Sequence, residues 1–300
     1  MRVLIIGASG FTGSRLLKLL SVNGEVHVTA IVHNKLADIY PGVEYHEASL
    51  TSISYTFLER GAFDYIFHLA RISGKRLRDF GRYAAGLKGK SANRKLLANI
   101  SRLPKQPKLI YLSGSLMYGT NKTPVKESAR LLPEGFAKYY VHAERPILDE
   151  LKSGNKNVMM LYAPWILGNG SWFEQVYKSY MRMKKAVPVY GDPQRMMSLI
   201  TVEDCAGMLW HYATHADYGR TYNIYTVQQL RYRDFISKVG KACDTEGTDV
   251  YSKQQLRSIM DKTTTNSICC EVVLGTEHED LLKSYEMKNP DIDEYLKTLC

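Results

Sequence analysis

The chain has 300 residues, of which 45% are hydrophobic and 23% charged, a composition typical of a globular protein with one large domain or two smaller domains that share a core. No stretch approaches the length of a membrane span, and the N-terminus has the pattern of a core strand and not of a signal peptide, so we expect no membrane partner. The net charge of +10 comes from scattered Lys and Arg residues with clusters at 75–82 and 88–95. This favours a solvated basic helix face over a nucleic-acid-binding surface.

The first predicted elements are a strand, a glycine turn and a helix within residues 2–20. Val3–Ile6 is a continuous apolar run, as in a strand buried on both faces, and leucines at 16, 17, 19 and 20 form a helical core face. Between them, Gly7 allows a tight turn, Gly10 lets a pyrophosphate approach the backbone, and Gly13 lets the helix pack on the strand. The sequence therefore predicts a dinucleotide site at the helix N-terminus, which also includes Ser9, Phe11 and Thr12.

The second predicted strand, residues 25–32, ends in His33, Asn34 and Lys35. A site specific for NAD would place an acidic residue here to bind the adenosine ribose, and none is present. A neutral or basic turn suits a 2′-phosphate better, so we expect NADP(H), with NAD(H) as the second choice. The alternative is that this turn is simply exposed to solvent.

Three further strands are predicted at residues 43–48, 63–70 and 108–112, with helices near 52–60 and 77–102 between them. This alternation predicts an α/β fold with a parallel sheet and crossover helices. Ser113 and Ser115 follow the fifth strand, at the sheet edge where ligands bind in such folds. They are candidates for binding a reacting oxygen, although isolated serines are also common in turns.

Several segments together resemble the extended short-chain dehydrogenase/reductases, the superfamily of NAD(P)-dependent epimerases and dehydratases. The resemblance covers roughly residues 1–240 and rests on six segments, at 7–13, 67–70, 112–119, 163–168, 198–204 and 222–224. It implies a doubly wound Rossmann sheet with a smaller mixed α/β C-terminal substrate domain. We expect residues 1–165 to form the NAD(P)-binding domain, with about 197–225 returning to it, and 166–300 to form mainly the substrate domain.

The resemblance also implies a catalytic Tyr as general acid/base, a Ser or Thr that binds the same oxygen, and a Lys four residues after the Tyr. Ser115 stands at the Ser/Thr position and Tyr140 at about the Tyr position, with Tyr139 as its rival. Neither is followed by Lys, since Glu144 lies four residues after Tyr140. A carboxylate cannot replace Lys as an electrostatic activator, although it could bind a ribose hydroxyl.

A different register remains open, in which Phe136 and Tyr140 occupy the Tyr and Lys positions and the usual acid/base is absent. In that case the tyrosines only line the pocket. The remaining residues that the resemblance assigns to the cofactor are Ser49, Leu50, Leu69, Ala70, Arg71, Ser113, Glu144, Pro164, Trp165 and Ile166.

The segment after residue 168 is expected to contact substrate, through Trp172, Phe173 and, from the earlier loop, Tyr118. Met197 stands where nucleotide-sugar enzymes of the family usually place an Arg for the substrate pyrophosphate, a bond that Met cannot make. Arg195 is the nearest candidate to replace it. The aromatic residues suggest an apolar or aromatic substrate, or alternatively only the core of the small domain.

Beyond residue 242 the resemblance ends. Helices are expected at 174–185, 231–242, 250–262, 278–287 and after 289, with a strand at 268–274. Residues 201–213 are expected to be a strand end that passes into a helix. Five cysteines, at 205, 243, 269, 270 and 300, show neither metal-ligand spacing nor a disulfide framework, which favours a reducing cytoplasm and no metal site.

The sequence thus predicts an NADP(H)-dependent oxidoreductase or epimerase that acts on a small carbonyl or hydroxyl compound other than a standard nucleotide sugar. A non-catalytic dinucleotide-binding sensor or scaffold is the main alternative, and a nucleic-acid-binding member is the least favoured. Family analogy suggests a homodimer.

Overall fold

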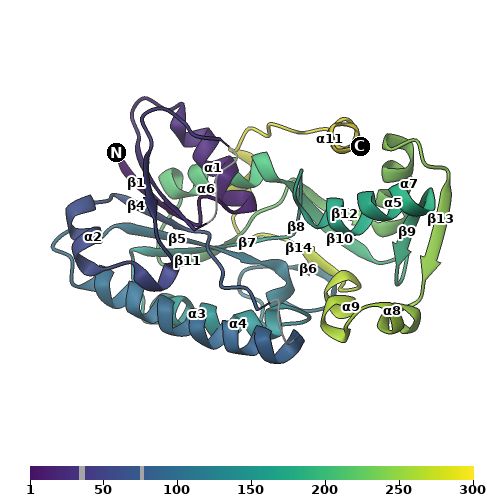
Figure 1. Ribbon diagram of the computed structural model, residues 1–300, viewed down its shortest axis with the longest axis horizontal. Helices are drawn as coiled ribbons and strands as arrows, with labels where there is room; N and C mark the ends of the chain where they lie inside the picture. The colour runs from purple at the N-terminus through teal and green to yellow at the C-terminus, as the bar shows by residue number, and fades with distance from the viewer. Residues whose placement is uncertain (34–37, 75–77) are drawn as a thin grey trace. The chain divides into compact units, whose positions relative to one another are not determined.

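The computed structural model describes residues 1–33, 38–74 and 78–300 (Figure 1). Its internal contacts divide it into two compact units, each made of three chain segments. The first unit comprises Met1–Ser113, Tyr139–Tyr162 and Ala206–Tyr222. The second unit comprises Gly114–Lys138, Ala163–Cys205 and Asn223–Cys300.

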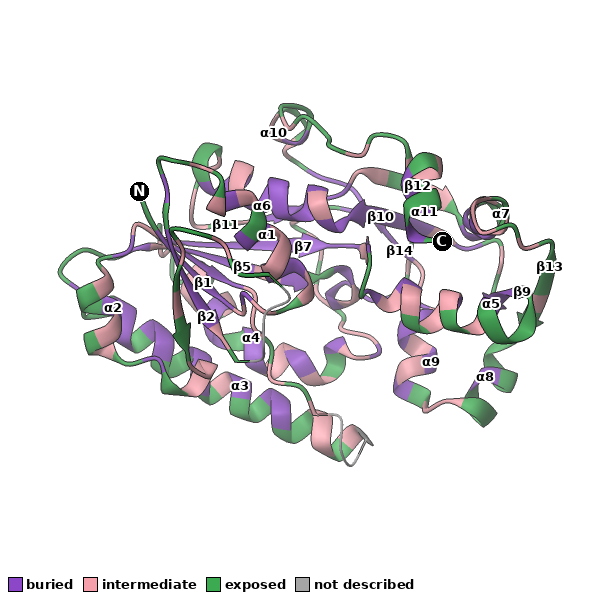
Figure 2. Ribbon diagram, turned by 45° about the horizontal axis from the view of Figure 1, so that its top comes forward, coloured by how far each residue is buried: buried purple, intermediate pink, exposed green. Residues whose placement is uncertain are grey.

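The first unit is built on a seven-stranded sheet with the order β11-β7-β5-β4-β1-β2-β3. All the pairings from β5 to β3 are parallel, which confirms the predicted Rossmann-like sheet. The strands are β1 (Arg2–Ile6), β2 (His27–Val32), β3 (Glu44–Glu47), β4 (Tyr65–His68), β5 (Lys108–Gly114), β7 (Val158–Ala163) and β11 (Arg220–Asn223). Figure 2 shows the middle strands buried along their length, as the uninterrupted apolar runs require.

The helices associated with this sheet are α1 (Phe11–Ser21), α2 (Tyr55–Gly61), α3 (Arg78–Ser101), α4 (Ala137–Lys152) and α6 (Val202–His215), with a 3-10 turn η1 (Leu50–Ser52). Helices α3 and α4 run side by side (Figure 1). They approach closely because α3 carries glycines at the contact: a Cβ on Gly89 would lie 2.7 Å from the Cβ of Ala143. Asn93 Nδ2 donates to the Ala143 carbonyl at 2.8 Å, which fastens the two helices together.

The second unit holds a mixed sheet with the order β12-β10-β14-β6, to which β8 adds by pairing with β10, and a separate parallel pair of β13 and β9. The strands are β6 (Asn121–Val125), β8 (Trp165–Leu167), β9 (Ala186–Tyr190), β10 (Met196–Thr201), β12 (Val227–Arg231), β13 (Gly247–Tyr251) and β14 (Val272–Leu274). The predicted smaller mixed α/β part is therefore present.

The helical elements of the second unit are η2 (Ser115–Met117), a π-helix η3 (Glu174–Lys178), α5 (Ser179–Lys184), α7 (Tyr232–Ala242), α8 (Lys253–Ile259), α9 (Lys262–Ile268), α10 (Glu279–Lys283) and α11 (Ile292–Leu299). The predicted helix at 250–262 is wrong at its start, because residues up to Tyr251 belong to β13 and pair with β9. The predicted strand at 268–274 is shorter than expected, since Ile268 ends α9.

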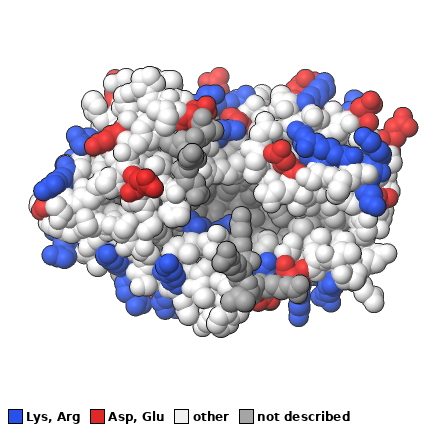
Figure 3. All heavy atoms as spheres, in the orientation of Figure 1, with Lys and Arg blue, Asp and Glu red and all other residues white. Residues whose placement is uncertain are grey.

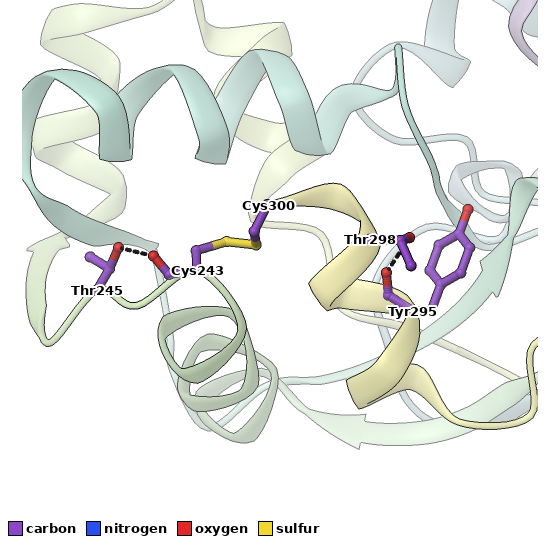
Figure 4. The surroundings of a disulfide bond; sticks show 5 residues. All are labelled: Cys243, Thr245, Tyr295, Thr298 and Cys300. Atoms are coloured by element: carbon purple, nitrogen blue, oxygen red, sulfur yellow. Dashed lines mark hydrogen bonds between the residues drawn. A yellow bond between two sulfur atoms is a disulfide. The ribbon is translucent and has the colours of Figure 1, made fainter.

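A disulfide joins Cys243, at the end of α7, to Cys300, at the end of α11 (Figure 4). The expectation that no cysteines pair is wrong for these two, which lie 57 positions apart in sequence and 5.0 Å apart between Cα atoms. Cys205, Cys269 and Cys270 are free thiols. Within the described residues, no cluster of side chains suited to a metal ion occurs, and no helix is long and apolar enough to cross a membrane.

Candidate functional site

The glycine turn between β1 and α1 requires glycine at two positions, at Gly7 for its backbone conformation and at Gly13 for lack of space. Gly7 has a φ of +92°, and a Cβ there would lie 2.8 Å from the Ala70 backbone nitrogen. A Cβ on Gly13 would overlap the Gly7 carbonyl oxygen. The turn is closed by a hydrogen bond from the Gly10 N–H to the Gly7 carbonyl at 2.9 Å, which brings the start of α1 to the end of β1.

A cavity of about 610 Å³ lies at this turn, beside the carboxyl ends of β1, β2 and β4. Nine of the predicted cofactor residues line it: Gly7, Ser9, Gly10, His33, Ser49, Leu50, Leu69, Ala70 and Arg71. The other lining residues, which sequence reasoning missed, are Ile6, Ile31, Ala48, Thr51, Ile72, Ser73 and Lys88. The signal for Lys88 was the basic cluster at 88–95, but nothing in the sequence showed that one of its members reaches the glycine turn.

The lining of this cavity is basic. Its charged or titratable residues, within the part of the chain that the structure describes, are His33, Arg71 and Lys88, and no Asp or Glu lines it. Such a lining suits an anionic ligand, and the glycine cradle at the N-terminus of α1 suits a pyrophosphate in particular. The residues present therefore fit a dinucleotide.

The other predicted cofactor residues lie elsewhere. Phe11, Thr12 and Gly13 form the first turn of α1 and do not line the cavity. Asn34 and Lys35 lie outside the described residues. Pro164, Trp165 and Ile166 belong to the second unit, where Trp165 and Ile166 pair with β10.

A second cavity, of about 660 Å³, lies in the second unit between α7 and the β9–β13 pair. Its lining mixes Arg233 and Lys241 with Asp244 and Glu246 and contains none of the predicted site residues. We assign the site to the cavity at the glycine turn, because there the backbone geometry and the charge of the lining agree.

Ser113 and Glu144 form a buried pair at the end of β5. The Ser113 hydroxyl donates to Glu144 Oε2 at 2.8 Å, and both residues are less than a tenth exposed. Burial raises the pKa of the Glu144 carboxyl to about 7, although the Ser113 hydrogen bond and the charge of Arg71 act in the opposite direction. Glu144 is therefore a carboxyl group that changes protonation near neutral pH.

Arg71 links this pair to the cavity. Its guanidinium carbon lies 4.3 Å from the centre of the Tyr140 ring, and the same residue lines the cavity. Tyr140 is buried, whereas Tyr139 is half-buried. Of the two candidate tyrosines, Tyr140 is thus the one that contacts a residue of the cavity lining.

A buried polar chain lies behind these residues. His68 Nε2 is 2.7 Å from Asn93 Oδ1, and the His68 ring packs edge-on against Tyr111. Since the amide oxygen accepts, Nε2 carries the proton, and within the described residues the buried Nδ1 has no hydrogen-bond partner. Burial lowers the pKa of His68 to about 4 and raises the pKa of Tyr111 far above its usual value, so both are neutral at physiological pH.

The predicted substrate residues and Ser115 belong to the second unit. Ser115 is buried at the start of η2. The Tyr118 hydroxyl donates to Asn223 Oδ1 at 2.8 Å, and the Asn223 side chain in turn donates to the Val125 and Gly275 carbonyls. Tyr118 thus helps to hold β6 and the end of β14 together.

Trp172 and Phe173 belong to an aromatic cluster that forms part of the second unit's core. The Trp172 ring lies 4.4 Å from that of Trp165 and 6.2 Å from that of Phe235, and Phe173 is almost fully buried against Tyr177. This packing favours the core alternative for Phe173. The role of Trp172 toward substrate stays a prediction.

Arg195 is buried and bound to the protein's own backbone. Its guanidinium donates to the carbonyls of Tyr190, Asp192 and Ile268 and stacks 3.5 Å from the ring centre of Tyr232. Met197, two residues later, is buried in the same core. These contacts give Arg195 a structural role, and its predicted contact with substrate stays a prediction.

The fold and the glycine cradle together define a dinucleotide-binding α/β protein. The sequence model of the NAD dependent epimerase/dehydratase family matches residues 3–227, and the chain belongs to this family of enzymes. No curated protein matches the sequence significantly.

Solved structures of similar fold include three at low sequence identity. UDP-glucuronic acid 4-epimerase from Bacillus cereus, with NAD, is 19% identical with a TM-score of 0.78, and 100% of each chain is covered. UDP-N-acetylglucosamine 4-epimerase from Methanobrevibacter ruminantium is 19% identical with a TM-score of 0.77, covering 99% of this chain and 96% of that one. dTDP-glucose 4,6-dehydratase from Bacillus anthracis, with NAD, is 14% identical with a TM-score of 0.76, covering 99% and 94%. These similarities show the fold.

Proposed function

We propose that this protein is an NADP(H)-dependent oxidoreductase or epimerase that acts on a small carbonyl or hydroxyl compound other than a standard nucleotide sugar. The observation that carries the proposal is the basic cavity at the glycine turn, whose lining holds His33, Arg71 and Lys88 without a carboxylate among the described residues. The 2′-hydroxyl of NAD would find no acidic acceptor there, whereas a 2′-phosphate would find cations.

The residues that would hold the cofactor follow from the lining. The turn Gly7–Gly10, with the positive dipole end of α1 behind it, would bind the pyrophosphate, and Ser49 and Leu50 would bind the adenine. Leu69 and Ala70 would contact the part of the cofactor beyond the pyrophosphate, and Arg71 would lie near a cofactor phosphate. When bound, the nicotinamide supplies hydride transfer, and the protein supplies orientation and proton movement.

For proton movement we propose Tyr140 as the acid/base and Ser115 as the group that holds the reacting oxygen, with Tyr139 as the alternative to Tyr140. The stacking of Arg71 over Tyr140 supports the choice of Tyr140, because it ties this phenol to the cavity lining. If Tyr140 is the acid/base, Glu144 on α4 stands at the family's Lys position, and its buried bond to Ser113 supports a role different from that of Lys.

The choice of substrate class rests on the absence of a charged clamp at the expected position. Met197 is apolar and buried, and the Arg195 guanidinium donates hydrogen bonds to three backbone carbonyls. The named relatives act on nucleotide sugars, whose pyrophosphate needs a cation. We infer a substrate without that group.

Cofactor preference is tested by titrating the protein with NADPH and NADH and following ligand fluorescence. We expect NADPH to bind about tenfold more tightly, a difference of about 1.4 kcal/mol. His33→Asp should remove this preference by placing a carboxylate at the end of β2. His27→Asp, at the exposed start of the same strand, is the matched control and should leave both affinities unchanged. Binding of neither cofactor would reject the proposal.

Catalysis is tested separately, by screening carbonyl compounds for oxidation of bound NADPH. Tyr140→Phe and Ser115→Ala should each lower turnover by at least about 100-fold while NADPH still binds. Binding without turnover of any compound would instead favour a non-catalytic sensor or scaffold, the second candidate, which the replacement of Lys by Glu144 supports.

A homodimer and a cytoplasmic location complete the proposal, although the Cys243–Cys300 disulfide is unusual for that compartment. The exposed residues Phe80, Tyr83 and Leu87 lie three and four positions apart on α3 and form an apolar stripe suited to a second copy. A nucleic-acid partner is not favoured, since Lys and Arg side chains occur in several separate places on the face shown in Figure 3, with Asp and Glu between them. Sedimentation of the protein at several concentrations checks the dimer.

A further inference from the structure

Arg71 is shared between the cavity and a buried carboxyl group. It follows β4, is itself exposed, and lines the cavity at the glycine turn. Its guanidinium lies over Tyr140, one helical turn before Glu144 on α4, and its positive charge favours the ionised form of Glu144. The charges of Arg71 and Glu144 also act on Tyr111, where the first lowers and the second raises the pKa of the phenol.

The other groups around Glu144 are neutral. Ser113 of β5 donates a hydrogen bond to the carboxylate, and Tyr111 of the same strand is a neutral phenol. From α3, Asn93 binds the Ala143 carbonyl next to Glu144, and neutral His68 binds Asn93 in turn. Among the described residues, Arg71 is therefore the cation whose charge acts on Glu144.

We propose that Arg71 couples cofactor binding in the cavity to the protonation of Glu144. A cofactor phosphate that pairs with Arg71 offsets its positive charge and so weakens the electrostatic effect that favours ionised Glu144. Cofactor binding is therefore accompanied by proton uptake at the Glu144 carboxyl group. This inference rests on the proposed function, because it needs a dinucleotide in the cavity. Glu144 would then become protonated when the cofactor binds.

The size of the effect follows from the position of Glu144 near neutrality. With a pKa of about 7, the carboxyl is half protonated at pH 7 before the cofactor binds. Arg71 is exposed, so its field is screened, and its neutralisation raises the Glu144 pKa only modestly. The expected uptake at pH 7 is then about a quarter to two-fifths of a proton. The cofactor should bind about three- to tenfold more weakly as the pH rises from 6 to 9.

The test is isothermal titration calorimetry of NADP⁺ and NAD⁺ at pH 7 in MOPS and in imidazole buffer. The difference in heat between the two buffers counts the protons taken up per cofactor bound. Glu144→Gln keeps an acceptor for Ser113 but cannot take up a proton, so its count should be lower by about a quarter to two-fifths of a proton. Subtracting its count from that of wild type also cancels protons taken by the cofactor's own phosphate.

Three further variants test whether the protons come from other groups and whether Arg71 is the link. His33 also lines the cavity, and an imidazole beside a phosphate can take up protons, so His33→Asn should change the count without removing the difference caused by Glu144→Gln. Arg71→Gln should remove that difference, and Arg71→Lys should keep it. Arg71 is exposed, so these variants do not disturb the buried core.

The outcomes separate the two proposals. Binding of NADP⁺ or NAD⁺ with equal proton counts in wild type and Glu144→Gln overturns this inference and leaves the proposed function standing. Absence of binding by wild type overturns the proposed function and this inference with it. A proton difference that persists in Arg71→Gln shows that Arg71 is not the link.

Discussion

Ser113, the penultimate residue of β5, donates its hydroxyl hydrogen to Glu144, in the middle of α4, at 2.8 Å in a setting that excludes water from both side chains. A buried carboxyl group thus stands four residues after Tyr140, and the protein binds it with a single side-chain donor. One donor does not offset the loss of hydration, which is why the Glu144 pKa is raised to about 7.

The first prediction concerns the stability of Glu144→Gln at different pH values. The folded state holds the Glu144 proton more tightly than the unfolded state does, because the pKa is about 7 in the first and 4.5 in the second. Glu144 therefore destabilises the fold as the pH rises from 4.5 to 7, by about 3 kcal/mol when complete. Between pH 5 and 8, Glu144→Gln should gain about 2–3 kcal/mol relative to wild type, measured by urea unfolding.

Its control is Glu25→Gln, at an exposed position where the carboxylate stays hydrated in both states. The difference in stability between Glu25→Gln and wild type should not change with pH. The prediction would be contradicted if the free energies of unfolding of wild type and Glu144→Gln differed by a constant amount from pH 5 to pH 8.

The sequence was sufficient to predict features that depend on residues close to one another in the chain. Val3–Ile6 had to be a buried strand because it is apolar on both faces, and Gly7 and Gly13 marked the turn because a Cβ fits at neither position. The nine predicted cofactor residues that line the cavity all follow a strand end or a glycine. Backbone geometry of this kind is encoded locally.

Contacts between distant positions could not be predicted in the same way. Ser113 and Glu144 lie 31 positions apart, and nothing in either segment shows that α4 directs Glu144 toward β5. Cys243 and Cys300 pair although the count and spacing of the five cysteines suggested no framework. The predicted helix at 250–262 took in the last two residues of β13, whose pairing with β9 decides their conformation.

The second prediction distinguishes two glycines of the turn. Gly13→Ala should destabilise the protein by at least about 2–3 kcal/mol, because the new Cβ overlaps the Gly7 carbonyl and neither backbone can move away. Gly10→Ala meets only the same carbonyl oxygen at 3.1 Å, so a small loss of stability is expected. Because Gly10 lines the cavity, its added methyl group should lower NADPH affinity by at least about tenfold.

Thermal unfolding and NADPH titration of both variants check this contrast, and each variant serves as the other's control. Equal stabilities would show that the packing of α1 on the turn is looser than described. Full NADPH affinity in Gly10→Ala would show that the pyrophosphate does not approach that backbone.

The third prediction concerns the disulfide, which ties the end of α7 to the last residue of α11 (Figure 4). Cys300→Ser should destabilise the protein by about 2–4 kcal/mol, because the bridge closes a long loop in the unfolded chain. Reducing agent should have the same effect on wild type and none on Cys300→Ser. Cys269→Ser, at a free thiol, is the control and should keep the sensitivity to reductant.

Thiol titration gives an independent check of the same bond. Wild type unfolded without reductant should show three reactive thiols, and five after reduction. Five thiols in both cases would mean that Cys243 and Cys300 remain reduced. That result would agree with the cytoplasmic location proposed above, where disulfides are rare.

The fourth prediction concerns His68, whose effect on stability is opposite to that of Glu144. Burial lowers the His68 pKa from 6.5 to about 4. Between these pH values His68 is protonated in the unfolded chain but not in the folded state. His68 therefore destabilises the fold as the pH falls through 6.5 toward 4, by about 2 kcal/mol between pH 7 and pH 5. Over the same pH range Glu144 becomes protonated, which stabilises the fold by a similar amount of free energy. The two contributions nearly cancel, and the part of wild-type stability that they determine should change little between pH 5 and 7.

His68→Gln removes one side of this balance while leaving an N–H that can donate to Asn93. Its stability relative to wild type should rise by about 2 kcal/mol as the pH is lowered from 7 to 5, the reverse of the trend for Glu144→Gln. The double variant should again show no trend, because both titrating groups are gone. Urea unfolding of the four proteins at pH 5, 6 and 7 measures this directly. A double variant with a trend as steep as either single variant would show that another group governs the pH dependence.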